Sequence, residues 1–273
     1  MNERLSAANK DVYLGLRVSE SGMGLRRRAF QIHLLASASV LLLVLGALYA
    51  GWYRWPGWYL TGASHLAAIM VGVDVALGPL LTLLIANPRK PRAELQRDIA
   101  MIVAMQLLAL GYGSATLWRG RPLYYAFSVN MLQLVQASDL DPPEARFAIR
   151  AELPLAPRWD SLPRWIWAPL PKDPKVRAGI VQAAITGGFD VTSMPPYFKP
   201  WNQGYGALRA RLKRVRDLRF FSAAQIAALV RRMRRARIAT DRANSLPLMG
   251  RGPPLLAVFD PVTLRLLALL RCT

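Results

Sequence analysis

The chain has 273 residues, of which 53% are hydrophobic and 19% are charged, and its formal net charge is +20. An apolar bias combined with an excess of cations indicates a membrane protein with a basic extramembrane part. The single Cys272 excludes an intrachain disulfide and a thiolate metal cluster, and two histidines, His33 and His65, argue against histidine zinc chemistry. No metal and no cofactor are therefore expected.

The first 118 positions hold the long apolar runs. Residues 1–24 are polar and without apolar periodicity, so they are predicted to form a disordered N-terminal extension; translation starting at Met23 is an alternative. Residues 25–118 are predicted to form a three-helix transmembrane bundle, because a helix needs about 20 apolar residues to cross about 30 Å of hydrocarbon. The three spans are expected at about 30–53, 65–86 and 99–118.

The cations in the short loops predict the orientation of the spans. Arg26, Arg27 and Arg28 precede the first span and four cations lie in the loop 87–98, whereas the loop between the first two spans has only Arg54. Loops rich in lysine and arginine stay in the cytoplasm. The N-terminus is therefore expected to be cytoplasmic and residues 119–273 to be periplasmic, in a multi-pass protein of a bacterial inner membrane.

Residues 119–273 are predicted to form a small, basic α+β domain. Its predicted elements are, in chain order, a strand or hairpin at 121–137, an acidic turn and helix at 139–150, loops with short helices at 152–200, helices at 205–218 and 222–239, and a hairpin at 255–270. Ser222 and Gln225 predict a capping box at the start of the second helix. Asp260 and Pro261 predict the first two positions of a type I turn in the hairpin.

The chain resembles the type IV pilin accessory proteins of the TfpX/TfpZ type, from about Met23 to its end. The resemblance is carried by the segments RRRAFQIHLL, GVDVALGPLLTLLIA, RPLYYAFSVNMLQLVQASDL and PLMGRGPPLLAVFDPVTLRLLALL. It implies an inner-membrane protein with a periplasmic domain that works with a type IV pilin in pilus assembly, stability or dynamics, without established catalytic activity. The pilus assembly machinery and membrane lipids are further expected partners. The N-terminal extension and the arginine density of Arg209–Arg237 depart from the family pattern, which leaves the cognate pilin open.

Asp74 is the first candidate for a partner contact inside the membrane. An ionisable group at membrane depth is costly unless it is paired, so it faces a partner, a cavity or a conducting path. The alternative is a carboxylate that is solvated near the outer surface, or hydrogen-bonded to His33, His65 or the backbone. The resemblance adds a specific partner, because such pilins hold an apolar N-terminal helix with a terminal amine and an acidic residue near its start.

Other candidate residues accompany Asp74. Gly78 and Pro79 predict a kink that either opens a groove or serves packing, and Thr82 lies one turn further. Partner contacts in the outer domain are expected at Arg121, Pro122 and Tyr124. Arg231, Arg232, Arg234 and Arg235 form either a solvated face or a contact for anionic lipid, and nucleic acid is the least favoured reading.

The function predicted from the sequence is non-catalytic binding of a pilin subunit. No nucleophile motif, phosphate-binding loop or metal-ligand spacing occurs in the sequence. Two alternatives stay open: a basic membrane-anchored module that binds lipid or nucleic acid, and an enzyme that modifies the pilin.

Overall fold

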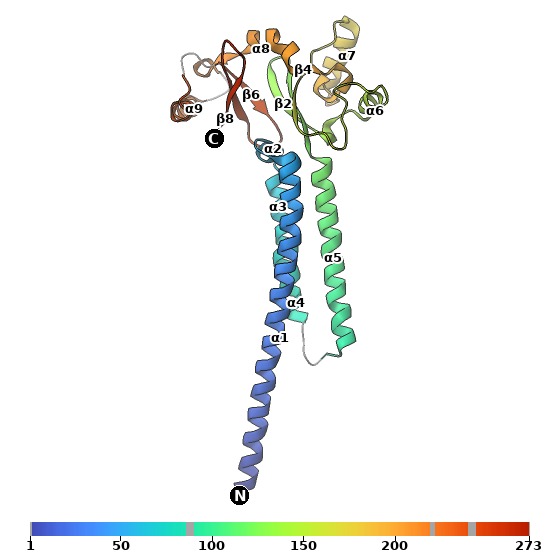
Figure 1. Ribbon diagram of the computed structural model, residues 1–273, viewed down its shortest axis with the longest axis vertical. Coiled ribbons are helices and arrows are strands. Elements are labelled where there is room, and N and C mark those ends of the chain that lie inside the picture. The colour runs from blue at the N-terminus through green and yellow to red at the C-terminus, as the bar shows by residue number, and fades with distance from the viewer. Residues whose placement is uncertain (1, 86–89, 219–221, 240–243, 273) are drawn as a thin grey trace. The chain divides into compact units, whose positions relative to one another are not determined.

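The computed structural model describes residues 2–85, 90–218, 222–239 and 244–272, with the backbone alone described for 2–23, 25 and 216. The chain divides into two compact units, whose elements are labelled in Figure 1. The helical unit comprises Met1–Ala47 and His65–Thr116, and the sheet unit comprises Leu48–Ser64 and Leu117–Thr273. Three apolar helices are thus followed by a domain built on a mixed β-sheet.

Within the described residues, three helices are long and apolar enough to cross a membrane, judged by length and composition. They are Arg26–Tyr53, Ala63–Ile85 and Arg92–Arg119. The elements that form them are α1 (Asn2–Leu48) with η1 (Tyr49–Tyr53); α3 (Ala63–Val71), η2 (Gly72–Leu77) and α4 (Gly78–Ile85); and α5 (Arg92–Arg119). The predicted spans 30–53, 65–86 and 99–118 fall on these helices, except for Ala86, which lies outside the described residues.

The N-terminal extension differs from its prediction. Helix α1 begins at Asn2, so the backbone of residues 2–24 is helical where the sequence predicts disorder. The segment contains no proline and continues directly into the apolar helix. Once a helix is nucleated, each added residue gains one hydrogen bond, so a polar segment of this composition extends the helix without apolar periodicity of its own.

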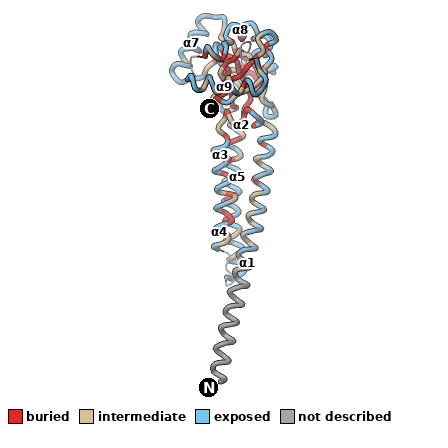
Figure 2. Tube along the Cα trace, turned by 90° about the vertical axis from the view of Figure 1, so that its left-hand side faces the viewer, coloured by how far each residue is buried: buried red, intermediate tan, exposed pale blue. Residues whose placement is uncertain are grey.

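The three apolar helices are covered by little of the protein itself. Figure 2 shows exposed and intermediate residues along most of their length. In the most apolar window of each helix, only 11%, 28% and 17% of the residues are buried, in chain order. The middle helix is covered most. Apolar surface of this extent requires a lipid or protein environment.

The sheet unit is built on an eight-stranded mixed sheet in the order β4-β3-β1-β2-β6-β7-β8, with β5 paired to β6. The strands are β1 (Pro122–Ser128), β2 (Met131–Gln136), β3 (Arg164–Trp167), β4 (Lys199–Pro200), β5 (Lys213–Arg214), β6 (Asn244–Met249), β7 (Leu255–Phe259) and β8 (Leu266–Arg271). Strands β7 and β8 form an antiparallel hairpin, which confirms the hairpin predicted at 255–270. Strands β1 and β2 also form one, so of the strand or hairpin expected at 121–137 the hairpin is observed. The β1–β3 and β2–β6 pairs are parallel.

The loop between β7 and β8 is longer than the predicted type I turn. The carboxylate Oδ1 of Asp260 accepts hydrogen bonds from the N–H groups of Val262 and Thr263, at 2.9 and 2.7 Å. These bonds, led by the one from Thr263, lower the pKa of Asp260. The N–H of Leu264 then donates to the Asp260 carbonyl at 3.0 Å, four residues back, so the side chain of Asp260 organises a wider loop.

Helices cover the sheet or connect its strands. They are α2 (Gly57–Thr61), α6 (Pro142–Arg150), α7 (Pro174–Ile185), α8 (Tyr205–Arg211) and α9 (Ala223–Arg235), with 3₁₀ turns at Ala137–Asp139, Val191–Ser193, Pro195–Tyr197, Trp201–Gly204 and Val215–Asp217. The capping box of Ser222 and Gln225 is confirmed at the start of α9. Helix α8 ends before the predicted position 218, because Leu212 is extended and β5 pairs with β6.

Strand β6 has no counterpart among the predicted elements, and Pro247 lies inside it. Proline cannot donate to a sheet ladder, so it argues against a central strand. One edge of β6 pairs with β5 at Asn244 and Ser245 and with β2 at Leu248 and Met249. Pro247 lies between these two short pairings, on a stretch where that edge of β6 has no partner strand. A central strand thus tolerates a proline.

The segment Leu48–Ser64 belongs to the sheet unit, although the sequence assigns it to the transmembrane domain. The side chain of Leu60 is fully buried in a core cluster with Phe127, Leu132 and Leu248. The N–H of Gly252 donates to the Leu60 carbonyl at 2.7 Å. The connection between the first two apolar helices therefore completes the core of the sheet unit.

Replacing Leu60 by alanine should destabilise the sheet unit. Truncating a fully buried leucine costs about 2–5 kcal/mol, because apolar contacts are lost and a cavity remains. Thermal unfolding and limited proteolysis of the full chain in detergent would measure the loss. Leu267→Ala is the matched control, since Leu267 is 45% exposed on β8. Equal stability of the two variants would contradict the placement of Leu60 in the core.

Candidate partner-binding site in the helical unit

The site begins with an irregular turn in the middle apolar helix. The N–H of Gly78 donates to the carbonyl of Val73, five residues back, as in a π-helix. In an α-helix, Gly78 would instead donate to the carbonyl of Asp74, and the next residue, Pro79, has no N–H to offer. The Asp74 carbonyl therefore lacks both of the bonds that its own helix could provide.

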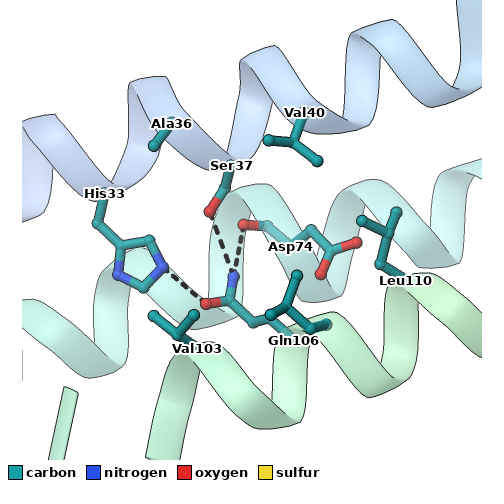
Figure 3. A pocket seen from close by; sticks show the side chains of 9 residues that line it. His33, Ala36, Ser37, Val40, Asp74, Val103, Gln106 and Leu110 are labelled. Atoms are coloured by element: carbon teal, nitrogen blue, oxygen red, sulfur yellow. Dashed lines mark hydrogen bonds between the residues drawn. The ribbon is translucent and has the colours of Figure 1, made fainter. Parts of the chain in front are cut away.

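Gln106 of α5 supplies the missing donor. Its side-chain Nε2 donates to the Asp74 carbonyl at 2.9 Å and lies 3.5 Å from the Ser37 hydroxyl of α1 (Figure 3). Gln106 is buried in the middle of an apolar helix. Since the side-chain N–H₂ of Gln106 is bonded to the Asp74 carbonyl, its oxygen Oε1 points away from that carbonyl. One glutamine thereby connects the three helices.

His33 of α1 continues this hydrogen-bond chain. Its Nε2 lies 2.6 Å from Gln106 Oε1, and its Nδ1 lies 2.6 Å from the Thr82 hydroxyl. Gln106 Oε1 only accepts, so Nε2 of His33 carries a proton. The Thr82 hydroxyl either donates to Nδ1 or accepts from it while donating to the Gly78 carbonyl at 3.2 Å. The hydrogen bonds therefore run from Gln106 through His33 to Thr82.

The carboxylate of Asp74 stays outside this chain. Asp74 is 4% exposed, and neither carboxylate oxygen has a hydrogen-bond partner in the described part of the protein. Asp74 lines a cavity of about 160 Å³ together with His33, Ser37 and Gln106. In Figure 3 the carboxylate points away from His33 and toward Leu110. A buried carboxylate without a donor is costly as an anion, so this group either carries a proton or awaits a donor.

The predicted membrane contacts come together in this site. Asp74, Gly78, Pro79 and Thr82 are all buried, so they face the interior of the helical unit. Asp74 lies halfway along the helix Ala63–Ile85, which does not fit the alternative of solvation near the surface. The alternative hydrogen bond also takes a different form. The backbone carbonyl of Asp74, and not its carboxylate, accepts a hydrogen bond, and the donor is Gln106. His33 is bonded to the side chain of Gln106 and not to Asp74. His65 is exposed.

The predicted contacts in the sheet unit are core residues instead. Tyr124 is fully buried, its hydroxyl donates to the Leu155 carbonyl at 2.8 Å, and burial raises the pKa of its phenol to about 12. Arg121 is 9% exposed and donates from Nη1 to the Trp118 carbonyl at 2.8 Å, and burial lowers the pKa of its guanidinium. Pro122 is buried at the start of β1. Direct partner contact by these three residues does not fit this burial.

The predicted arginine surface lies on α9. Leu229 and Met233 of this helix are fully buried in a core cluster. Arg231, Arg234 and Arg235 are exposed. Arg232 is partly buried and donates from Nη1 to the Arg271 carbonyl. Three of the four arginines are thus available to an anionic surface.

The sequence interpretation did not identify Gln106 or Ser37 as site residues. A signal for them exists in the spacing of the cavity lining. On α1 and on α5 the lining positions follow the pattern i, i+3, i+4 and i+7 of one helix face, and they are His33, Ala36, Ser37 and Val40, and Val103, Gln106, Leu107 and Leu110. An uncharged polar residue in an apolar helix is a weak signal of a site on its own, because the free-energy cost of placing a side chain in the membrane is largest for charged groups.

Gly78→Ala should disrupt this hydrogen-bond chain. A Cβ at Gly78 would overlap the side-chain amide of Gln106, so the amide would have to leave the Asp74 carbonyl. An unpaired buried polar group costs about 1–3 kcal/mol, which thermal unfolding in detergent would detect. Gly111→Ala in α5 is the control, because a Cβ there meets nothing within 4 Å. If Gly78→Ala is as stable as the control, Gln106 does not hold this position.

Comparison with family models and with solved structures gives no match. Curated proteins similar to the chain include three fimbrial assembly proteins of Dichelobacter nodosus. The serogroup E1 protein is 27% identical over 225 residues, which cover 80% of this chain and 84% of that protein. The serogroup I protein is 32% identical over 109 residues, which cover 40% of this chain but only 42% of that protein.

The relative of serogroups C1 and C2 is covered more completely. It is 32% identical over 109 residues, which are 40% of this chain and 83% of that protein. Identity at this level over most of a relative's length shows common membership of a family. The chain therefore belongs to the family of the fimbrial assembly proteins, which confirms the resemblance to pilus-related accessory proteins.

Proposed function

We propose that this protein is a non-catalytic accessory protein of an inner membrane that binds a type IV pilin subunit and assists pilus assembly, stability or dynamics. The observation that carries the proposal is the Asp74 carboxylate, which is buried, faces a cavity and lacks a donor. Family membership supports the link to pili, since the relatives are named fimbrial assembly proteins. The assembly machinery is a further partner in this proposal.

The proposed orientation follows from the charges next to the apolar helices. Arg26, Arg27 and Arg28 stand at the start of the first helix, and Lys90 and Arg92 lie just before and at the start of α5. Both cation-rich ends are cytoplasmic in this proposal, and the sheet unit is periplasmic. The low burial of the three helices supports a location in lipid.

The pilin helix would reach Asp74 through the cavity between α1 and α5. Exposed apolar side chains lie on both of these helices, among them Leu35, Leu43, Leu107 and Leu108. An apolar helix packs against such a surface without burying polar groups, and an amine on it would give the carboxylate its missing donor. Asp74 of the π-turn Gly72–Leu77 lines this cavity, and Gly78 and Pro79 directly follow the turn.

The exposed arginines of α9 support a second contact. Arg231, Arg234 and Arg235 present positive charge on the sheet unit, and anionic headgroups are the partner that a basic amphipathic helix next to a membrane contacts most readily. No base-reading motif accompanies them in the sequence, so nucleic acid is not proposed.

Asp74→Asn should reduce recovery of the pilin. A hydrogen bond to a charged group contributes about 1.5–3 kcal/mol, so co-purification of the organism's type IV pilin with the tagged protein should fall about tenfold or more. Glu94→Gln in α5 is the control, because it removes an exposed carboxylate from the same unit. Wild-type pilin recovery and surface piliation in Asp74→Asn would refute the proposed contact.

The orientation can be tested with cysteines at two exposed glutamines, Gln96 at the start of α5 and Gln182 in α7. A membrane-impermeant maleimide should label Gln182→Cys in intact spheroplasts, and Gln96→Cys only after lysis. The native Cys272 should stay unlabelled, because burial raises the pKa of its thiol to about 11 and the reactive thiolate is scarce near pH 7. Labelling of Gln96→Cys in intact spheroplasts would reverse the proposed orientation.

A further inference from the structure

A second cavity lies within the sheet unit, with a volume of about 390 Å³. It is large enough for part of a small organic ligand. Its lining is mainly aromatic rings and prolines from the segment after α1, from β1 and from the region of β3, and these residues are Trp52, Trp55, Pro56, Tyr125, Pro163 and Trp165. Leu266 and Leu269 of β8 close the lining. We call this cavity the aromatic groove.

The rings of the aromatic groove are held in place by their neighbours. Tyr125 stacks on Trp165 with ring centroids 4.9 Å apart. Trp52 packs edge-on against Trp118 at 4.8 Å, and its Nε1 donates to the Ser161 carbonyl at 2.8 Å. A groove built from fixed rings loses little conformational freedom when a ligand binds.

Polar groups that lack partners stand at the groove. Tyr125 is 6% exposed, and its hydroxyl forms no hydrogen bond within the described residues. Arg54 lines the groove, is exposed, and forms no ion pair among the described side chains. The guanidinium of Arg271 lies 5.3 Å from the ring centroid of Trp55. The groove has no acidic residue in its lining, so its charge is complementary to an anion.

The chain places the groove next to the end of a spanning helix. The first apolar helix, Arg26–Tyr53, has 28 residues and is about 42 Å long, which exceeds the hydrocarbon thickness of about 30 Å. When this helix crosses the membrane as proposed, its excess length lets the last turn, with Trp52, lie in the headgroup region. Leu162 and Trp55 line the groove and are 59% and 45% exposed. Exposed apolar and tryptophan side chains beside an arginine are typical of the membrane interface.

We propose that the aromatic groove binds an anionic phospholipid, with an acyl chain along the aromatic rings and the phosphate at Arg54. This inference rests on the proposed crossing of the membrane by the helices and is independent of pilin binding. Aromatic grooves also bind proline-rich peptides. The lipid is favoured here because the groove combines an unpaired cation with exposed apolar side chains at the level where headgroups meet acyl chains.

The proposal can be tested by native mass spectrometry of the full chain in detergent. Phosphatidylglycerol and phosphatidylcholine with identical acyl chains are titrated separately. Phosphatidylglycerol should bind about fivefold more tightly, as expected for one arginine near an anionic headgroup. Arg54→Gln should remove this preference, and Leu162→Glu should weaken both lipids, because it places a carboxylate beside the acyl chain.

Matched variants outside the groove are the controls. Arg150→Gln removes an exposed arginine from α6, and Trp159→Ala removes a ring that is 73% exposed and does not line the groove. Both should bind the lipids as the wild type does, and thermal unfolding should show that Arg54→Gln and Leu162→Glu are folded.

Several results would overturn the proposal. The first two are equal binding of phosphatidylglycerol and phosphatidylcholine, and a loss of lipid binding in the control variants as large as in Arg54→Gln and Leu162→Glu. The third is that glycerol phosphate competes for the groove as strongly as the whole lipid does. The fourth is that a proline-rich peptide displaces bound lipid at a concentration lower than that of the lipid. Measuring pilin recovery with the same variants separates the two proposals, since Arg54→Gln should leave it unchanged.

Discussion

The helical unit depends on one backbone carbonyl. Pro79 has no N–H, and the π-turn before it directs the Gly78 N–H to Val73, so the carbonyl of Asp74 must find a donor in another helix. In an apolar environment an unpaired carbonyl is expensive, which makes the Gln106 amide a structural requirement. The amide in turn fixes the direction of its own oxygen, and this oxygen fixes the proton on His33. An irregularity in one helix thus determines how polar groups in three helices are arranged.

This arrangement satisfies the backbone of Asp74 and leaves its carboxylate unpaired. His33, Gln106 and Thr82 are engaged with one another, so they are not free to turn toward the carboxylate without breaking existing bonds. A carboxylate that served only the stability of the bundle would be expected to take part in this network. Its exclusion from the network, at the edge of a cavity, is the property expected of a group reserved for a ligand or partner. In the proposed function, a donor on the pilin helix would offset the cost of burying this carboxylate.

The sequence predicted those parts of the fold that local chemistry specifies. The spans follow from apolar length, the hairpins β1–β2 and β7–β8 from strand-type runs, and the start of α9 from its capping box. It failed where tertiary contacts decide. Strand β6 contains Pro247, which is tolerated because it lies between the segment of β6 that pairs with β5 and the segment that pairs with β2. The segment around Leu60 was predicted as a loop of the transmembrane domain, since nothing local reveals that its side chain completes the core of the sheet unit.

In the site, too, local chemistry could be predicted from the sequence and tertiary contacts could not. Asp74 was found because a charge in an apolar run is conspicuous, and Gly78 and Pro79 because they break helices. Gln106 is uncharged, and its importance depends on which carbonyl the π-turn exposes, so the sequence alone could not identify it. Tyr124 was expected to be a partner contact from the family resemblance, although its hydroxyl is satisfied inside the sheet unit. The binding residues proposed for this protein share one property, which is that they line a cavity: Asp74 does so in the helical unit, and Arg54 and Tyr125 in the sheet unit. The buried Tyr124, whose hydroxyl donates to the Leu155 carbonyl, lines neither cavity.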